Sequence, residues 1–350
     1  MLKIFIKILI LAISLLAVIQ LLSIERPFYW GNENLMYKMG CVQDDIYKYD
    51  CYFIGSSRTH RHLDVRLFDE LNGAKTKSYN LGSMGSLQPE GLMMVKEILQ
   101  AKKDFKPKSI IMELMIMDHK DLTIDQKSNY YFNFGTLVYS LKYFITDDYM
   151  NIGQRFSNSS LMVRMSVANA FKAGNISKML FGEYDRKPSE KGYTDCELLD
   201  HGYCPFELSN LGASGEEIAM LKKRRKLYKT HVEDLSKRKN FHLKQLGNLN
   251  ELVVNEAALS ALEELHELAA NKGINLVYYL PPRLKEMEVN ELLSIYKSLS
   301  NKYKIDVSSP DRFPDLYEDR YSFDLIHLNK EGSKRFTEYL AQQFLQLNLD

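Results

Sequence analysis

After residue 50, short apolar runs alternate with stretches of helical periodicity. An apolar run at 52–54 ends at Gly55 and predicts a short buried strand. A second strand is predicted at 77–81, stopping at Gly82, and a third at 109–114, after Pro107. Residues 63–71 and 89–101 have apolar positions three and four apart, as in an amphipathic helix. Strands and helices in this order favour a parallel sheet with right-handed crossovers.

The alternation stops near residue 120 and resumes near residue 253. Further strands are predicted at 274–280 and 304–307, and further helices at 255–271, 290–303 and 330–345. Five strands with helices between them predict an α/β fold, a three-layer α/β/α sandwich with a five-stranded parallel sheet.

The residues between these two parts, about 120–252, are rich in Tyr, Phe and Asn at their start. Helical spacing recurs within them at 137–144, 161–173 and 216–238, and 196–210 resembles a loop. Because the strand and helix pattern resumes afterwards, we expect a large, mostly helical insertion or lid on the sheet rather than a separate domain.

The N-terminal residues predict a membrane helix. Lys3 and Lys7 precede an apolar run at 8–24, which as a helix reaches roughly 25 Å. No small-x-small cleavage site follows, which favours an uncleaved signal anchor at 1–25 over a cleaved signal peptide or a buried core helix. The lysines predict a cytoplasmic N-terminus and a translocated remainder, with a connector at 26–50 and an extracytoplasmic domain at 51–350.

Composition limits the classes of function. Hydrophobic residues make up 45% and charged residues 26%, which is ordinary for a globular chain and excludes wholesale disorder or a multi-span membrane bundle. The formal charge is only +1, so no global field attracts the chain to nucleic acid.

Four cysteines allow two interpretations. Cys41 and Cys51 are ten residues apart and Cys196 and Cys204 are eight apart, so two local disulfides in an oxidising compartment are possible. Free, buried thiols are the alternative. No C-x-x-C spacing indicates a zinc site.

Candidate chemistry is found where strands end, because ligands of open parallel sheets bind outside the carboxyl ends of the strands. Ser57 follows the first strand in a Gly-Ser-Ser turn, where a helix N-terminus supplies N–H groups for an oxyanion. It is a candidate nucleophile, although serine in such a turn is also a common helix cap.

A second candidate group stands before the last predicted helix. Asp324 precedes His327 by three residues, so its carboxylate can accept from one ring nitrogen while the other faces a serine. This pair supplies the base that a serine hydroxyl needs. The alternative is a turn-capping aspartate beside a surface histidine.

Three of these segments resemble sequence blocks of the SGNH (GDSL-like) hydrolases, in the family's order. They are Gly55-Ser56-Ser57, the Asn80-Leu81-Gly82-Ser83-Met84-Gly85 turn and Asp324-Leu325-Ile326-His327. The resemblance covers roughly 51–118 and 274–345 and implies the flavodoxin-like SGNH fold. It also implies that Ser57 attacks an acyl carbonyl, that His327 is the base oriented by Asp324, and that no metal or cofactor takes part. The oxyanion donors would be the backbone N–H groups of Ser57 and Gly85, with Gly82 as an alternative.

One block departs from the family. Where the family has G-x-N-D, residues 115–118 are Met-Ile-Met-Asp, so Met117 replaces an asparagine that donates to the oxyanion. The loss of one such donor typically costs about 10²–10³ in rate. Branches that begin with G-S-S also diverge here, and they include membrane-anchored proteins similar to those of alginate O-acetylation and teichoic-acid D-alanylation.

The resemblance therefore implies a serine-dependent esterase or O-acyltransferase that acts on ester-linked acyl groups, acetyl above all, of a cell-envelope glycan. A membrane-bound O-acyltransferase is an expected partner. The alternative, which Met117 favours, is a non-catalytic envelope protein of the same fold that binds glycan or such a partner.

Basic and aromatic positions add weaker signals. Arg58 and Arg283 follow predicted strands, so we expect them to bind an anionic substrate, although most such residues are simply solvated. His60, His62 and His119 do not predict a metal site, because no carboxylate or cysteine accompanies them at ligand spacing.

Overall fold

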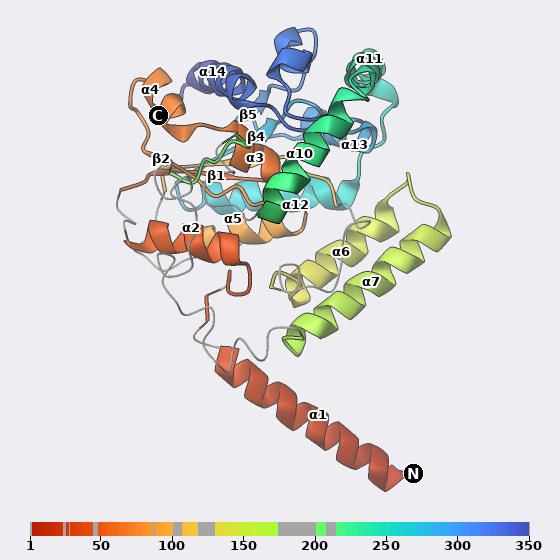
Figure 1. Ribbon diagram of the computed structural model, residues 1–350. Helices are drawn as coiled ribbons and strands as arrows, with labels where there is room; N and C mark the ends of the chain where they lie inside the picture. The colour runs from red at the N-terminus through yellow and green to blue at the C-terminus, as the bar shows by residue number, and fades with distance from the viewer. Residues whose placement is uncertain are drawn as a thin grey trace. The chain divides into compact units, whose positions relative to one another are not determined.

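The structure is a computed structural model (Figure 1). It describes residues 2–23, 26–27, 29–44, 48–86, 88–100, 107–117, 130–173, 201–207 and 215–349. The chain divides into two compact units, of which one comprises 1–37 and 118–190 and the other comprises 38–117 and 191–350. The expected insertion is thus not a single element. Its first part belongs with the N-terminal residues, and its second part belongs with the sheet.

The second unit, here called the sheet unit, contains the predicted five-stranded parallel sheet. The strand order is β2-β1-β3-β4-β5. The strands are β1 (Cys51–Ile54), β2 (Ser78–Asn80), β3 (Ser109–Glu113), β4 (Asn275–Leu280) and β5 (Lys304–Asp306). The chain passes from β1 to β2 on one side and then returns to β3 on the other. The order reverses there, and such a switch point is where open α/β sheets bind ligands.

Helices cover both faces of this sheet (Figure 1). On one face α5 (Glu90–Gln100) packs against α12 (Glu256–Ala270), and on the other α4 (Val65–Leu71) packs against α14 (Lys330–Gln346). β1 and most of β3 and β4 are apolar, as is typical of strands buried on both faces, whereas β2 has the polar Ser78 and Asn80 on either side of Tyr79. The core between the sheet and α14 contains Phe53, Ile111, Val277, Phe336 and Leu340.

Several helices differ from the prediction. The helix expected at 63–71 is preceded by a separate short helix, α3 (Ser57–His62), and Asp64 caps α4 by accepting from two backbone N–H groups. The helix expected at 290–303 is α13 (Glu286–Ser298).

The long helix expected at 216–238 is two helices, α10 (Gly215–Lys229) and α11 (Glu233–Gly247). At the break, the N–H groups of Thr230 and His231 bond to carbonyls three residues back, which tightens the end of α10. Threonine, histidine and valine at 230–232 are weak helix formers, and the acidic Glu233 and Asp234 favour a new helix start.

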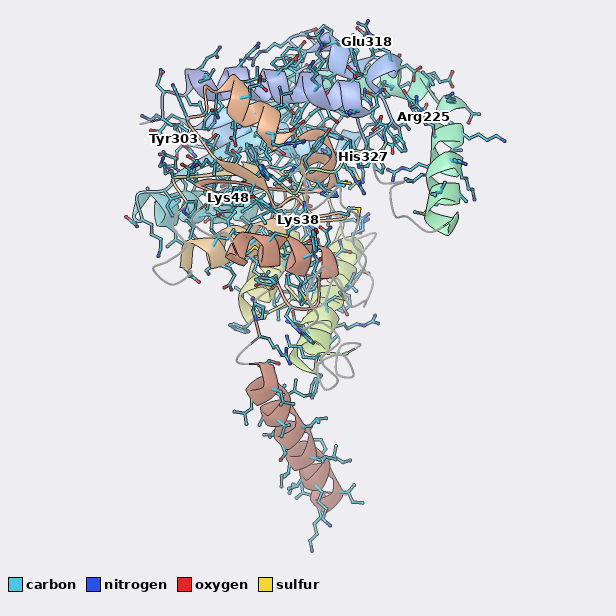
Figure 2. The ribbon with its side chains drawn as sticks, turned by 60° about the vertical axis from the view of Figure 1, so that its left-hand side comes forward. Lys38, Lys48, Arg225, Tyr303, Glu318 and His327 are labelled. Atoms are coloured by element: carbon cyan, nitrogen blue, oxygen red, sulfur yellow. The ribbon has the colours of Figure 1, made fainter. Side chains whose placement is uncertain are left out.

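Residues 26–50 also contain a helix that the sequence pattern did not indicate, α2 (Glu33–Asp44). Leu35, Met39 and Val42 form its apolar stripe, but Lys38 is fully buried in the same stripe and obscures the pattern. Lys38 Nζ donates to the carbonyls of Asn80, Gly82 and Gly202, within the sheet unit (Figure 2).

The first unit contains α1 (Leu2–Ser23) and a hairpin of α6 (Phe134–Thr146) and α7 (Ile152–Ala170). α1 is long and apolar enough to cross a membrane, as predicted. Its end is joined to the end of α7, because Gln20 Nε2 donates to the Ala170 carbonyl at 3.0 Å. Ile19 and Trp30 form a small core there, with Phe171 packed against it.

Of the two interpretations of the cysteines, the structure supports buried thiols at one position. Cys51 in β1 is buried and carries a free thiol, so the Cys41–Cys51 disulfide is absent. Burial raises the pKa of the Cys51 thiol far above its usual range, which makes it unreactive. Cys196 lies outside the described residues.

Candidate active site

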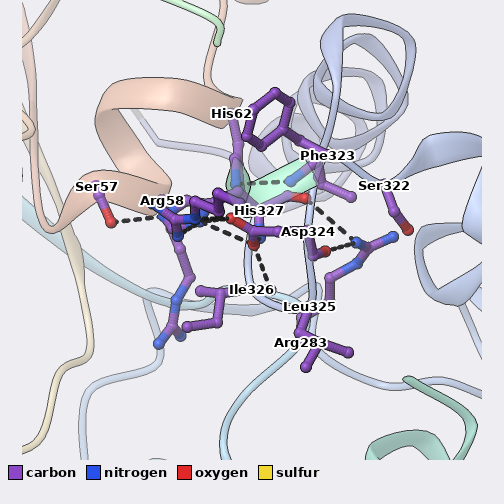
Figure 3. A network of polar contacts seen from close by, with 12 residues as sticks. Ser57, Arg58, His62, Arg283, Ser322, Phe323, Asp324, Leu325, Ile326 and His327 are labelled. Atoms are coloured by element: carbon purple, nitrogen blue, oxygen red, sulfur yellow. Dashed lines mark hydrogen bonds and ion pairs between the residues drawn. The ribbon is translucent and has the colours of Figure 1, made fainter. Parts of the chain in front are cut away.

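Ser57 and His327 meet at the carboxyl end of β1. Ser57 begins α3, and Ser56 caps that helix by accepting from the Arg58 N–H at 3.1 Å. His327 lies in the turn before α14, 270 residues away in sequence, and its Nε2 is 2.8 Å from Ser57 Oγ (Figure 3). The predicted proximity of these two side chains is therefore confirmed, and the hydroxyl has an acceptor nitrogen within hydrogen-bond reach.

Asp324 orients the ring of His327. Both Asp324 carboxylate oxygens lie 3.1 Å from His327 Nδ1. Asp324 Oδ1 also accepts the backbone N–H groups of Ile326 and His327, each at 2.7 Å, so the carboxylate fixes its own turn. A ring that donates from Nδ1 to Asp324 presents an unprotonated Nε2 to Ser57, which is the tautomer that a general base needs.

The charges of this pair follow from its environment. Burial lowers the pKa of His327, and it outweighs the hydrogen bond and charge of Asp324, which raise it. For Asp324 burial raises the pKa, but the hydrogen bond from His327 and the positive charges nearby outweigh it and hold the pKa well below the usual range. The pair therefore consists of an ionised carboxylate and a neutral imidazole near pH 7.

Arg224 of α10 contacts the same two side chains. Its Nε lies 2.5 Å from Asp324 Oδ2, and its Nη2 lies 3.0 Å from His327 Nδ1. In the productive tautomer, Nδ1 carries a proton and cannot accept a hydrogen bond from Arg224. Arg224 then stabilises the site through its ion pair with Asp324. Its guanidinium also lies over the ring of Phe206, which meets the His327 ring edge-on at 5.0 Å. Arg224 stands in the basic run 222–226, and nothing in that run distinguishes it.

The expectation that Arg283 binds substrate is wrong, because its guanidinium is fully buried and bonded to backbone carbonyls (Figure 3). It donates to Leu316 O at 2.6 Å, Asp324 O at 3.1 Å, His327 O at 3.3 Å and Glu318 O at 3.3 Å. Burial lowers its pKa to about 10, so it remains charged. Arg283 holds the Asp324–His327 turn from within.

Arg58 is likewise not free to bind substrate. It is buried and forms an ion pair with Glu288, and its Nε lies 4.0 Å from Glu113 Oε1. Glu113, at the end of β3, also accepts from the Ser56 N–H at 2.8 Å, from Ser56 Oγ at 2.8 Å and from Thr59 Oγ1 at 2.6 Å. Glu113 was not predicted as a site residue, although an acidic residue at the end of a buried apolar strand is itself a signal.

The approach of Glu113 explains the glycine before the two serines. A Cβ at Gly55 would lie 1.9 Å from Thr59 Oγ1 and 2.6 Å from Glu113 Cβ. Only glycine allows the serine turn to lie this close to β3.

The histidines of α3 support neighbouring segments. His62 is fully buried, and its Nε2 accepts the Leu328 N–H at 3.1 Å next to the catalytic candidate His327. Burial lowers its pKa well below the usual range, so it is neutral. His60 Nδ1 lies 2.8 Å from Lys38 Nζ. His119 lies outside the described residues, and among those described no three His, Cys, Asp or Glu side chains are grouped as metal ligands.

Of the two glycines considered as oxyanion donors, Gly82 is excluded. Its N–H donates to Asn80 Oδ1 at 2.9 Å. Gly85 is exposed in the following turn at φ +67°, and the Ser83 N–H bonds to Gly55 O at 2.9 Å, which ties this loop to the serine turn. Within the described parts of the chain, the Ser57 N–H has no acceptor. Met117 is buried and apolar, so it supplies no donor.

No protein-family model matches the chain, and no curated protein matches it in sequence. What can be concluded about chemistry therefore rests on the geometry of Ser57, His327 and Asp324 and on the three short motifs that contain them.

Proposed function

We propose that this chain is a serine-dependent esterase or O-acyltransferase of the SGNH type, with the flavodoxin-like SGNH fold. The observation that carries the proposal is the continuous contact from Ser57 Oγ through the His327 ring to the Asp324 carboxylate. A hydroxyl, a neutral imidazole and a buried carboxylate in this order form the relay that activates serine in acyl transfer.

The reaction would proceed in two halves. Ser57 Oγ bonds to the acyl carbon as its proton moves to His327 Nε2, and the carbonyl electron pair becomes an oxyanion held by the N–H groups of Ser57 and Gly85. Collapse breaks the ester C–O bond, and His327 returns the proton to the leaving alkoxide. Water or a sugar hydroxyl then attacks the acyl carbon and gives its proton to His327. The bond between the acyl carbon and Ser57 Oγ breaks, and His327 returns the proton to Ser57, which completes hydrolysis or transfer.

We further propose that the substrate is an acyl ester, acetyl above all, of a cell-envelope glycan. The support is the apolar helix α1 with its preceding lysines, which would anchor the chain with the site on the extracytoplasmic face. A membrane-bound O-acyltransferase would be the partner that supplies or accepts the acyl group.

Labelling with a fluorophosphonate tests the nucleophile directly. The full chain in detergent micelles should react, and Ser57→Ala should not, at unchanged circular dichroism. Acetate release from an O-acetylated glycan, compared with acetyl uptake by the deacetylated glycan, then separates hydrolysis from transfer.

A non-catalytic envelope protein is the second candidate function. Two observations favour it, namely the apolar Met117 and the contact of Arg224 with both Asp324 and His327. A folded wild-type chain that fails to react with the fluorophosphonate would replace the first proposal with this one.

A further inference from the structure

The α6–α7 hairpin of the first unit carries an apolar stripe on the outer side of each helix. On α7 the stripe contains Ile152, Phe156, Val163 and Val167, all exposed, with Ile152 at 85% and Phe156 at 77%. On α6 it contains Phe134, Val138 and Ile145. Successive positions of the stripe are four, seven and four residues apart on α7, and four and seven residues apart on α6. At about 100° per residue, each stripe stays within roughly 60° of the helix surface.

These stripes are not the packing surfaces of the hairpin. The buried positions of α7 are Asn158, Met162, Met165 and Asn169, and those of α6 include Tyr143 and Phe144. α7 therefore has a buried side of methionines and asparagines and, on a different side, an exposed apolar stripe. A helix that faces water normally has a polar outer side, and a large exposed apolar surface usually marks a binding surface.

The connection with α1 indicates what covers these stripes. The bond from Gln20 to the Ala170 carbonyl joins the last turn of α7 to the last turn of α1, and Ile19, Trp30 and Phe171 pack at the same place. The apolar side chains of α1 are themselves exposed along its length. If α1 spans a bilayer, its end marks the boundary of that bilayer, so Val167 and Val163 lie within two helical turns of the boundary.

We propose that the α6–α7 hairpin is a membrane-interface element whose apolar stripes enter the acyl-chain boundary of the bilayer that α1 spans. The inference rests on the anchoring part of the proposed function and is independent of its chemistry. Interfacial helices place an apolar face about 5–10 Å into this boundary, and side chains such as Phe, Ile and Val suit that depth.

The single tryptophan of the chain, Trp30, makes a direct test possible. The full chain is reconstituted at low protein-to-lipid ratio in phosphatidylcholine vesicles with brominated acyl chains, which quench tryptophan at contact. Phe156→Trp adds a reporter in the stripe, and Ser157→Trp adds one at the next exposed position, about 100° away. Arg164→Trp is a second exposed control.

The added emission of Phe156→Trp should be quenched at least twofold more strongly than that of either control. Suppose that the wild-type chain floats with the vesicles but the three added tryptophans are quenched equally. This result would overturn the hairpin proposal and leave the anchor intact. A blue-shifted but unquenched reporter would mean that protein, a second copy or a partner, covers the stripe, which also overturns it. A wild-type chain that does not float with the vesicles would overturn both the anchor and the hairpin proposal, whereas fluorophosphonate labelling reports separately on the chemistry.

Discussion

Among the arginines that reach the Asp324–His327 turn, Arg283 and Arg224 come from different regions of the sheet unit and act on different parts of it. Arg283, after β4, is fully buried and donates only to backbone carbonyls, two of them in this turn. Arg224, on α10, has a side chain 41% exposed and contacts the carboxylate and the ring themselves. The inner arginine thus determines the shape of the turn, and the outer arginine affects its charges.

The largest effect is expected at the Asp324 carboxylate, which Arg224 contacts directly and which lies in the turn that Arg283 holds. Asp324→Asn removes the charge and the acceptor that hold the Nδ1 proton of His327, so the ring can adopt the wrong tautomer. The rate of fluorophosphonate labelling should fall by about 10⁴, as for the equivalent change in a serine-histidine-aspartate triad. Asp311→Asn, at an exposed position, is the matched control and should label like wild type. A fall of less than tenfold would show that Asp324 does not orient the base.

The next largest effect is a difference in stability between variants of Arg283 and Arg224. Arg283→Met removes a donor from four carbonyls, of which those of His327 and Glu318 keep other donors. The carbonyls of Leu316 and Asp324 lose their donor, and each buried unsatisfied group costs about 1–3 kcal/mol, so the loss should reach about 3 kcal/mol or more. Arg224→Met should cost about 1 kcal/mol or less, because a half-exposed ion pair contributes little. Thermal unfolding of both variants in detergent measures the difference. Similar losses of Tm would contradict the assignment of inner and outer roles.

The smallest effect concerns pH. Only neutral His327 can accept the serine proton, so labelling should decline as pH falls through its pKa, which burial and the charge of Arg224 place below the ordinary value of about 6.5. Arg224→Gln removes that charge and should move the midpoint of the pH profile upward, with little change of rate at pH 8. Lys223→Gln on the same helix should leave it in place. A downward or absent shift would rule out this role of Arg224.

The sheet could be predicted chiefly because β1, β3 and β4, which are buried on both faces, leave short apolar runs in the sequence. The meeting of Ser57 with His327 was predicted on other grounds, namely the three-residue spacing of Asp324 and His327 and the resemblance of these segments to SGNH blocks, because His327 does not directly follow a strand. α2 was not predicted because a buried lysine interrupts its apolar stripe. The division between the units at 190 was missed because helical periodicity does not reveal which helices pack together.

The site was predicted less completely than the sheet. Arg58 and Arg283 were assigned to substrate because a sequence shows a positive charge but not its partner, and here the partners are Glu288 and backbone carbonyls. Arg224 approaches the relay only because α10 lies next to the histidine turn, a contact between segments about 100 residues apart. Such contacts leave no local pattern.

The environment of Glu113 limits which amino acids that position can accept. Its two oxygens receive an amide and two hydroxyls, and all of these groups approach as donors. Glutamine has the same shape but would direct an NH₂ group at one of them, and aspartate would end one methylene short of the serine turn. We infer that position 113 tolerates almost no variation, whereas the buried Met117, four residues later, has no such set of donors to satisfy and can be replaced by an apolar side chain of similar volume.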